Sequence, residues 1–162
     1  MQSGGVQPPL YFAYGSNLEP AQMAARCPGH HVIGRAVLPD HRLNFRGYGR
    51  DWAGAEATIE PSLGARVYGV VFAITAVHYA SLDAYEGYDG PGAASNLYDR
   101  IVVQVEMEDG STVAVETYAM RPGREPAGAP SARYRDAILA GMRHHGLSAE
   151  AIAALVGLKP AD

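Results

Sequence analysis

Short apolar runs separated by glycine and proline recur along this chain, and their order limits the folds open to it. Runs of roughly four to eight residues, some of them alternating between apolar and polar side chains, are typical of β-strands. We expect strands over residues 10–14, in two pieces within 32–45, and over 55–59, 67–74, 98–108 and 112–120, and helices over 19–26, 76–86, 132–144 and 149–156. These strands and helices do not alternate one for one. The order therefore predicts an α+β fold whose mostly antiparallel sheet can close into a small β-barrel flanked by the helices.

Individual residues support these boundaries. Thr75, Ser131 and Ser148 can each accept a hydrogen bond from the first turn of a following helix, and Gly87 suits the end of the second helix. Pro39-Asp40 is expected to bend the chain between two strands. The stretch 47–54 reads as a glycine-rich loop, and 109–110 (Asp-Gly) as a hairpin turn.

The length suits one domain. The chain has 162 residues, of which 48% are hydrophobic and 19% charged. Domains most often have ~100–150 residues, and this composition is that of a chain able to bury a core. We expect a flexible leader over residues 1–9, a single domain over residues 10–158 and a tail over residues 159–162.

Charge and composition argue against several classes of protein. The net charge is −4, and Lys159 is the only lysine, so binding of nucleic acid through phosphate neutralisation is not expected. The apolar run 70–74 is far shorter than the ~20 residues of a membrane span, so we expect no membrane partner. No signal-peptide pattern is present, which favours a cytoplasmic protein. The oligomeric state stays open, and a homodimer is compatible with the sequence.

Metal and nucleophile motifs are not expected to carry the chemistry. Cys27 is the only cysteine, which excludes an internal disulfide and a Cys-x-x-Cys metal site. The paired histidines 30–31 and 144–145 lack the spacing of a helical zinc site. Ser16 does not lie in a Gly-x-Ser-x-Gly elbow, so a hydrolase nucleophile is unsupported.

The turn over residues 14–18 (Tyr-Gly-Ser-Asn-Leu) is the first candidate for a binding site. A strand that enters a helix through a glycine leaves backbone N–H groups directed outward, where they can hold an anion such as a carboxylate. Gly15 can adopt a positive φ and lets a ligand approach the main chain. The alternative is an ordinary connection between a strand and a helix.

Glu86 is the second candidate. On a helical wheel it shares a stripe with the apolar residues Tyr79 and Leu82, whereas Asp83 points elsewhere. Burial on that face and the position in the last helical turn both disfavour the charged form and raise the pKa of Glu86. A raised pKa suits a general acid/base. The alternative is that the helix frays at Gly87 and lets Glu86 reach water.

Tyrosines are the third signal. The chain has ten of them, and Tyr98, Tyr118 and Tyr134 each lie at or near the end of an expected element. Phenols in such positions can direct hydroxyl groups into a pocket, although half-buried packing is the commoner role.

Several segments together resemble the gamma-glutamylcyclotransferase family. The most specific is residues 11–18, Tyr-Phe-Ala-Tyr-Gly-Ser-Asn-Leu. Further similar segments follow in the same order: 40–45, 57–59, 67–72, 82–87 (which ends in Glu86-Gly87), 118–120 and 130–134. The resemblance covers about residues 10–147.

The resemblance implies a small β-barrel with a pocket at one mouth and an enzyme that needs no metal or coenzyme. It implies conversion of a γ-glutamyl amide to 5-oxoproline and a free amine, through attack of the substrate's own α-amine. Glu86 occupies the position of the catalytic acid/base. The implied substrate-binding residues are Tyr11, Phe12, Ala13, Tyr14, Gly15, Ser16 and Asn17 through their backbone, and Tyr98, Tyr118 and Tyr134.

Two alternatives stay open at this level. One is a non-catalytic barrel that binds a small anion, and the other is a γ-glutamyl amidase that releases glutamate. The loop 88–97 is longer than the family pattern leads us to expect and lies beside Glu86. The sequence therefore predicts the γ-glutamyl half of the substrate and leaves the leaving amine open.

Overall fold

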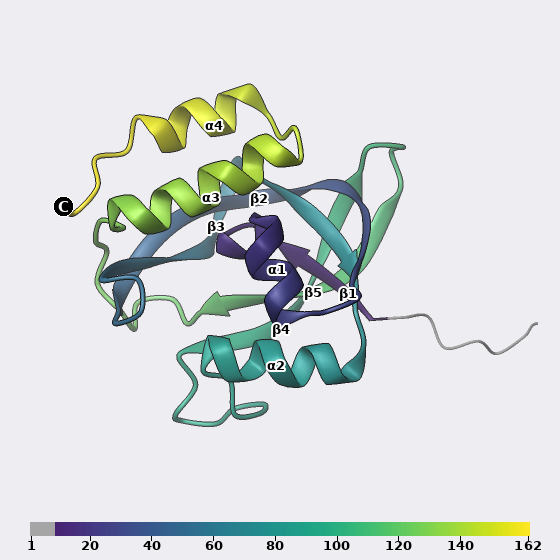
Figure 1. Ribbon diagram of the computed structural model, residues 1–162, viewed down its shortest axis with the longest axis horizontal. Coiled ribbons are helices and arrows are strands. Elements are labelled where there is room, and N and C mark those ends of the chain that lie inside the picture. Colours follow the sequence, from purple (N-terminus) through teal and green to yellow (C-terminus); the bar gives the residue numbers. More distant parts are fainter. Residues whose placement is uncertain (1–8) are drawn as a thin grey trace, which may run out of the picture.

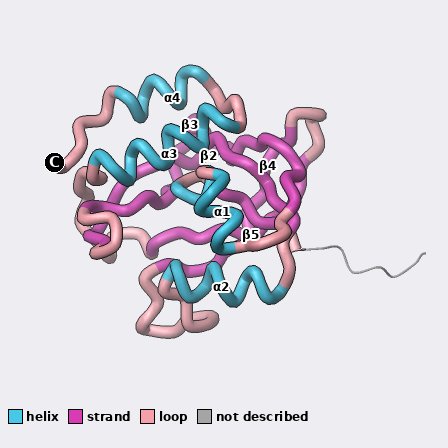
Figure 2. Tube along the Cα trace, in the orientation of Figure 1, coloured by secondary structure: helices cyan, strands magenta, loops and turns pink. Residues whose placement is uncertain are grey.

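Five strands close into a barrel that carries the helices on its outside (Figures 1 and 2). The computed structural model describes residues 9–162. Its elements are β1 (Leu10–Ala13), the short 3-10 helix η1 (Ser16–Leu18), α1 (Pro20–Arg26), β2 (His31–Gly49), β3 (Gly54–Ala73), α2 (Ala76–Glu86), β4 (Tyr98–Met107), β5 (Thr112–Met120), α3 (Ala132–His144) and α4 (Ala149–Val156). The strand order is β1-β3-β2-β4-β5, so the expected α+β barrel is confirmed.

The barrel is antiparallel except where it closes. β1 pairs with β3, β3 with β2, β2 with β4, and β4 with β5, all antiparallel. Only the seam between β1 and β5 is parallel, through Tyr11 and Glu116. Closure leaves no sheet edge to be covered.

The second and third strands differ from the expectation. The two strands within 32–45 and the two over 55–59 and 67–74 are in fact two long strands, β2 and β3. At Pro39-Asp40 the chain makes a bulge: the register shifts there, Asp40 has φ 56°, and its carboxylate accepts a hydrogen bond from the Gly64 amide at 2.9 Å. A bulge bends a strand without ending it, which a closing sheet needs. Only residues 50–53 of the expected 47–54 loop lie outside strands.

The expected helix boundaries are confirmed, with α1 beginning one residue later than expected. Thr75 forms a capping box with His78, and Gly87 ends α2 in the left-handed conformation with φ 66°. Ser131 and Ser148 accept hydrogen bonds from the first turns of α3 and α4. These interactions are local, which is why the sequence reveals them.

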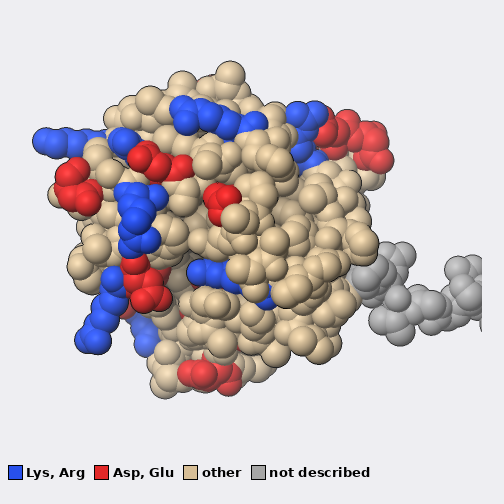
Figure 3. Space-filling view, in the orientation of Figure 1, with Lys and Arg blue, Asp and Glu red and all other residues tan. Residues whose placement is uncertain are grey.

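Figure 1 shows how the helices surround one end of the barrel: α3 and α4 lie on one side, α2 on the other, and α1 between them. Neither sign of charge dominates the face seen in this orientation (Figure 3). No helix within residues 9–162 is long and apolar enough to cross a membrane. Cys27 is buried.

The expected leader and tail are only partly described. Residues 1–8 lie outside the described residues, and the carbonyl of Pro9 accepts a hydrogen bond from the Ile74 amide at 3.0 Å. At the other end, the Ala161 amide donates to the carbonyl of Pro130 at 2.8 Å, so the last residues lie against the start of α3.

Candidate active site

A small hollow at one end of the barrel brings together all but two of the residues expected to form the site. It is lined by Tyr11, Tyr14, Gly15, Ser16, Asn17, Ala57, Glu86, Tyr98, Tyr118 and Tyr134. These residues come from β1 and the turn after it, from β3, β4 and β5, and from the ends of α2 and α3. Because these segments are distant in sequence, only barrel closure can place them together.

Phe12 and Ala13 do not contribute side chains to this hollow. Both are fully buried in the wall of the barrel. The carbonyl of Phe12 accepts a hydrogen bond from the Thr117 hydroxyl at 2.8 Å, and Ala13 pairs with Val70. Their role is therefore to hold β1 between its neighbouring strands.

The turn after β1 presents free main-chain donors. The amides of Leu18 and Glu19 donate to the carbonyls of Gly15 and Ser16 at 3.0 Å. The amides of Ser16 and Asn17 donate to no acceptor within residues 9–162. They therefore remain available to an anion at the hollow.

Gly15 does not use the positive φ that its residue type allows. Its φ is −116°, so the expected left-handed conformation is wrong. An added Cβ would lie 3.5 Å from the Cβ of Ala57 and 3.9 Å from the hydroxyl of Tyr134. A methyl group would make ordinary van der Waals contacts there, so the glycine leaves the space between these two residues open without being required by a clash.

Glu86 is the last residue of α2, and its side chain is partly buried at the hollow. Burial raises its pKa to about 7, the negative charge of Glu56 adds to the rise, and the positive charge of Arg26 opposes it. Within residues 9–162 the carboxyl group makes no hydrogen bond and no ion pair. A carboxyl group with a pKa near neutrality and no protein partner can both accept and donate a proton.

Comparisons with known proteins identify the family. A model of the family described as "Gamma-glutamyl cyclotransferase, AIG2-like" matches residues 11–137. The chain belongs to this family. It is 32% identical over 157 residues to the gamma-glutamylcyclotransferase of Homo sapiens, across 94% of this chain and 80% of that protein.

Solved structures support the same assignment. A structure described as "Gamma-glutamyl cyclotransferase" is 31% identical to this family member, with a TM-score of 0.88 over 96% of this chain and 90% of the other. The Bacillus subtilis protein YkqA is 24% identical, with a TM-score of 0.78 over 96% of this chain and 57% of its own. The second likeness shows the shared fold alone.

The tyrosines of this family member divide into two groups by hydrogen bonding. Tyr14 and Tyr98 donate to the carbonyls of Tyr118 and Ala57, each at 2.5 Å. By contrast, the hydroxyl of Tyr11 accepts from the Asn17 side chain, and that of Tyr134 accepts from the Ala57 amide, both at 2.9 Å. Neither of these two hydroxyls donates to an acceptor within residues 9–162, so their protons are free for a ligand.

Burial keeps these phenols neutral. It is the main cause that raises the pKa of every tyrosine at the hollow, namely Tyr11, Tyr14, Tyr98, Tyr118 and Tyr134. They are therefore hydrogen-bond donors rather than proton carriers near neutral pH. Glu86 is the group at the hollow whose protonation changes in that range.

As the helical wheel predicts, Asp83 does not line the hollow. The wheel did not reveal its partners, however: its carboxylate accepts from the Tyr118 hydroxyl at 2.5 Å and pairs with Arg100 at 2.8 Å. Its neighbours come from β4 and β5, which a wheel drawn for one helix does not include. Ala57 was also missed as a lining residue, although segment 57–59 is among those that resemble the family.

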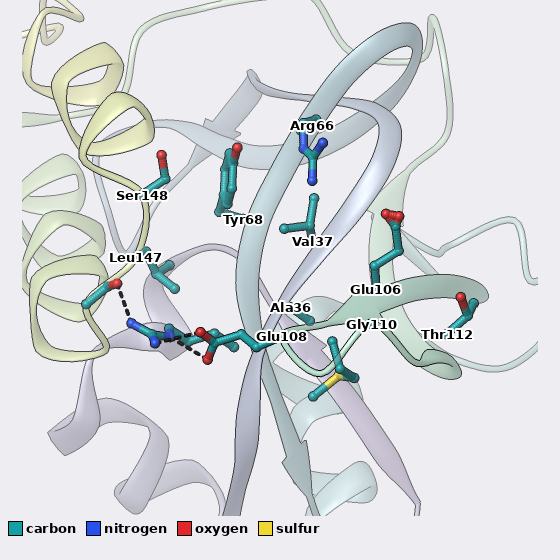
Figure 4. A pocket seen from close by; sticks show the side chains of 13 residues that line it. Ala36, Val37, Arg66, Tyr68, Glu106, Glu108, Gly110, Thr112, Leu147 and Ser148 are labelled. Atoms are coloured by element: carbon teal, nitrogen blue, oxygen red, sulfur yellow. Dashed lines mark hydrogen bonds and ion pairs between the residues drawn. The ribbon is translucent and has the colours of Figure 1, made fainter.

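A larger hollow lies between β2, β4 and the segment after α3 (Figure 4). Two of its four charged side chains pair with each other, because Arg35 forms a two-point ion pair with Glu108, and Arg35 also donates to the carbonyl of Gly146. No groups of three or more His, Cys, Asp or Glu able to hold a metal ion occur within residues 9–162. The hollow at Glu86 remains the candidate active site.

Proposed function

We propose that this family member converts a γ-glutamyl amide into 5-oxoproline and a free amine, with Glu86 as the general acid/base. The observation that carries the proposal is that Glu86, with a pKa of about 7, lines the same hollow as the free amides of Ser16 and Asn17. Such a site can hold a carboxylate while it moves a proton. The names of the relatives agree with this activity.

The turn would hold one end of the substrate. The α-carboxylate of the γ-glutamyl group binds to the amides of Ser16 and Asn17, which fixes the adjacent α-amine. The chain then curls so that this amine meets its own γ-carbonyl carbon. Alignment of both groups within one molecule lowers the activation barrier by ~7–11 kcal/mol relative to a reaction between two molecules.

Glu86 would carry the proton. It accepts a proton from the α-ammonium group, and the amine forms a bond to the γ-carbonyl carbon. The amide bond to the leaving nitrogen then breaks, and Glu86 returns its proton to that nitrogen. Glu86 then takes the second proton from the ring nitrogen and passes it to the released amine, which departs as an ammonium ion.

Two phenols would stabilise the charge that develops on the carbonyl oxygen. Tyr11 and Tyr134 are the tyrosines at the hollow whose hydroxyl protons are not donated within residues 9–162. Neutral donors held in place at a partly dry site suit an oxyanion. We therefore expect Tyr134→Phe to reduce turnover, less severely than a change at Glu86.

The test is product analysis with a matched pair of variants. The protein is incubated with γ-glutamyl amino acids and γ-glutamyl-ε-lysine, and 5-oxoproline, glutamate and amine are quantified. Glu86→Gln should lower 5-oxoproline release at least about 100-fold, because the proton carrier is lost. Glu106→Gln, on the far hollow of Figure 4, should be as active as the wild type.

Each alternative predicts a different product. Release of glutamate by the wild type would support the amidase, and no turnover with ligand still bound would support the non-catalytic barrel. If Glu86→Gln keeps more than a tenth of the activity, Glu86 is not the acid/base.

We also propose that the substrate is a small molecule handled by a single domain over residues 10–158. Cytoplasmic location and the lack of a nucleic-acid partner stay predictions from composition. Light scattering would measure the oligomeric state, for which a homodimer is compatible with the sequence.

A further inference from the structure

Arg26, the last residue of α1, contacts both halves of the candidate active site. Its Nη1 donates to Oδ1 of Asn17 in the anion-holding turn at 3.0 Å. Its guanidinium carbon lies 4.1 Å from the centroid of the Tyr85 ring, and Tyr85 directly precedes Glu86 in α2. One side chain therefore joins the turn to the helical end that carries the acid/base.

The contact with Asn17 determines which way its amide group faces. The amide oxygen accepts from Arg26 and from Gln22, each at 3.0 Å, so the amide nitrogen must face the other way. There it donates to the hydroxyl of Tyr11 at 2.9 Å. Because that hydroxyl accepts from Asn17, its own proton is left for the hollow.

The stack on Tyr85 is favoured for a planar, delocalised cation. Guanidinium groups stack on aromatic faces and donate in a fixed fork, and an ammonium group does neither in the same way. No carboxylate pairs with Arg26 within residues 9–162, so its charge is not cancelled by a direct partner. That charge therefore acts on the groups around the hollow.

We propose that Arg26 is a positioning residue for the reaction: it orients Asn17 and Tyr11 and, through Tyr85, holds the end of α2 against the turn. This inference rests on the proposed function. Arg26 itself does not line the hollow, and so it acts through its neighbours. Its two contributions, orientation and charge, can be separated by substitution.

The charge contribution concerns Glu86. The positive charge of Arg26 lowers the pKa of Glu86, against the effects of burial and of Glu56. The other titratable groups that face Glu86 are Tyr11, Tyr14, Tyr98, Tyr118 and Tyr134, all neutral near pH 7. Loss of the Arg26 charge should therefore raise the pKa of Glu86, and loss of the Glu56 charge should lower it.

The experiment measures kcat and KM against pH for 5-oxoproline release by four variants. Arg26→Met keeps the length of the side chain but removes the charge and the fork, whereas Arg26→Lys keeps the charge and loses the fork. Glu56→Gln is the control of opposite sign, and Arg35→Met is the control at an exposed arginine that does not line the hollow. Thermal unfolding of each variant is measured alongside.

We expect Arg26→Met to shift the acidic limb of the kcat/KM pH profile to higher pH, by about half a pH unit or more. It should also raise KM by about tenfold, the effect of one oriented hydrogen bond. Arg26→Lys should raise KM similarly while the limb stays in place. Glu56→Gln should shift the limb to lower pH, and Arg35→Met should change neither the limb nor KM.

An unchanged limb in Arg26→Met, or an unchanged KM in Arg26→Lys, would overturn the proposal.

A double-mutant cycle adds a readout that a purely structural role would not move: in a Tyr11→Phe background, Arg26→Lys should add little to KM. Additive effects in that cycle would also overturn it. If Arg26→Met does not fold, Arg26→Lys and the cycle still decide. Failure of the proposed function is recognised separately, because the wild type would then release no 5-oxoproline.

Discussion

The chemistry proposed for this protein depends on one carboxyl group whose ionised form is unfavourable. The pKa of Glu86 is raised by burial to about 7, so the folded protein holds the proton of this group more tightly than the unfolded chain does. The tighter binding of this proton stabilises the folded state. That contribution is fully present below the ordinary pKa of 4.5 and is lost as the pH rises through 7. A proton carrier suited to neutral pH thus makes the fold less stable at alkaline pH.

This cost leads to a prediction about Glu86→Gln. At pH 8 the variant should be more stable than the wild type by about 1–3 kcal/mol, because it no longer holds a desolvated charge. At pH 4 the two proteins should be equally stable. Urea unfolding at both pH values measures the difference, and a variant less stable at pH 8 would contradict the assigned pKa.

A second pH effect is expected in the rate. The base form of Glu86 is the form that accepts the first proton, so kcat/KM should fall as the pH drops below about 7. The measurement is the rate of 5-oxoproline release between pH 5 and pH 9, in buffers of constant ionic strength. A limb near pH 4.5 would mean that the group acting as base is not desolvated.

At the scale of elements, β1 lies very close to β3. A Cβ on Gly69 would lie 2.3 Å from the carbonyl oxygen of Ala13 and 2.7 Å from the ring of Phe12. Phe12 and Ala13 are thus held by a strand that can approach only because it carries a glycine there. The position of the turn that follows β1 depends on this approach.

Gly69→Ala should therefore loosen β1 and lower the Tm by about 6–12 °C, because the added methyl meets backbone and a rigid ring. Gly34→Ala in β2 is the matched control: its Cβ would lie 3.4 Å from the flexible end of Met107, and its stability should change by less than about 1 kcal/mol. Calorimetry compares the two variants. Equal melting temperatures would contradict the close packing of β1 on β3.

At the scale of the whole molecule, α3 presses against the turn. A Cβ on Gly141 would lie 2.3 Å from the carbonyl carbon of Leu18 and 2.6 Å from the amide nitrogen of Glu19. Tyr134, at the start of the same helix, reaches the hollow. The helix therefore supports the turn after β1 and also places a phenol at the hollow.

Gly141→Ala should consequently lower both stability and kcat/KM, even though alanine favours a helix by about 1 kcal/mol over glycine. The clash is with backbone, so α3 must move away from the turn and carry Tyr134 with it. Gly157→Ala at the end of α4, where an added Cβ would make only ordinary contacts, should change neither. Activity and thermal unfolding are measured on the same preparations, and normal activity in Gly141→Ala would contradict this coupling.

Much of this protein follows from local sequence. The limits of α2 are set by the cap at Thr75 and by Gly87, whose interactions span only a few residues. The segment 11–18 and the Glu86-Gly87 pair are short enough to be recognised without a structure. In contrast, β2 and β3 could not be outlined correctly, because the bulge at Asp40 depends on pairing with residues far along the chain.

Local sequence thus determined the barrel class, the helix ends, the family and most of the residues at the hollow. Tertiary structure alone decided that Asp83 accepts a hydrogen bond from Tyr118 and that Ala57 faces Gly15. It also decided that the hydroxyl protons of Tyr11 and Tyr134 are not donated to any acceptor within residues 9–162. The reason is physical. Caps and turns are satisfied within a few residues, whereas the burial and hydrogen-bond partners of a side chain come from whichever distant segments the closed barrel packs against it.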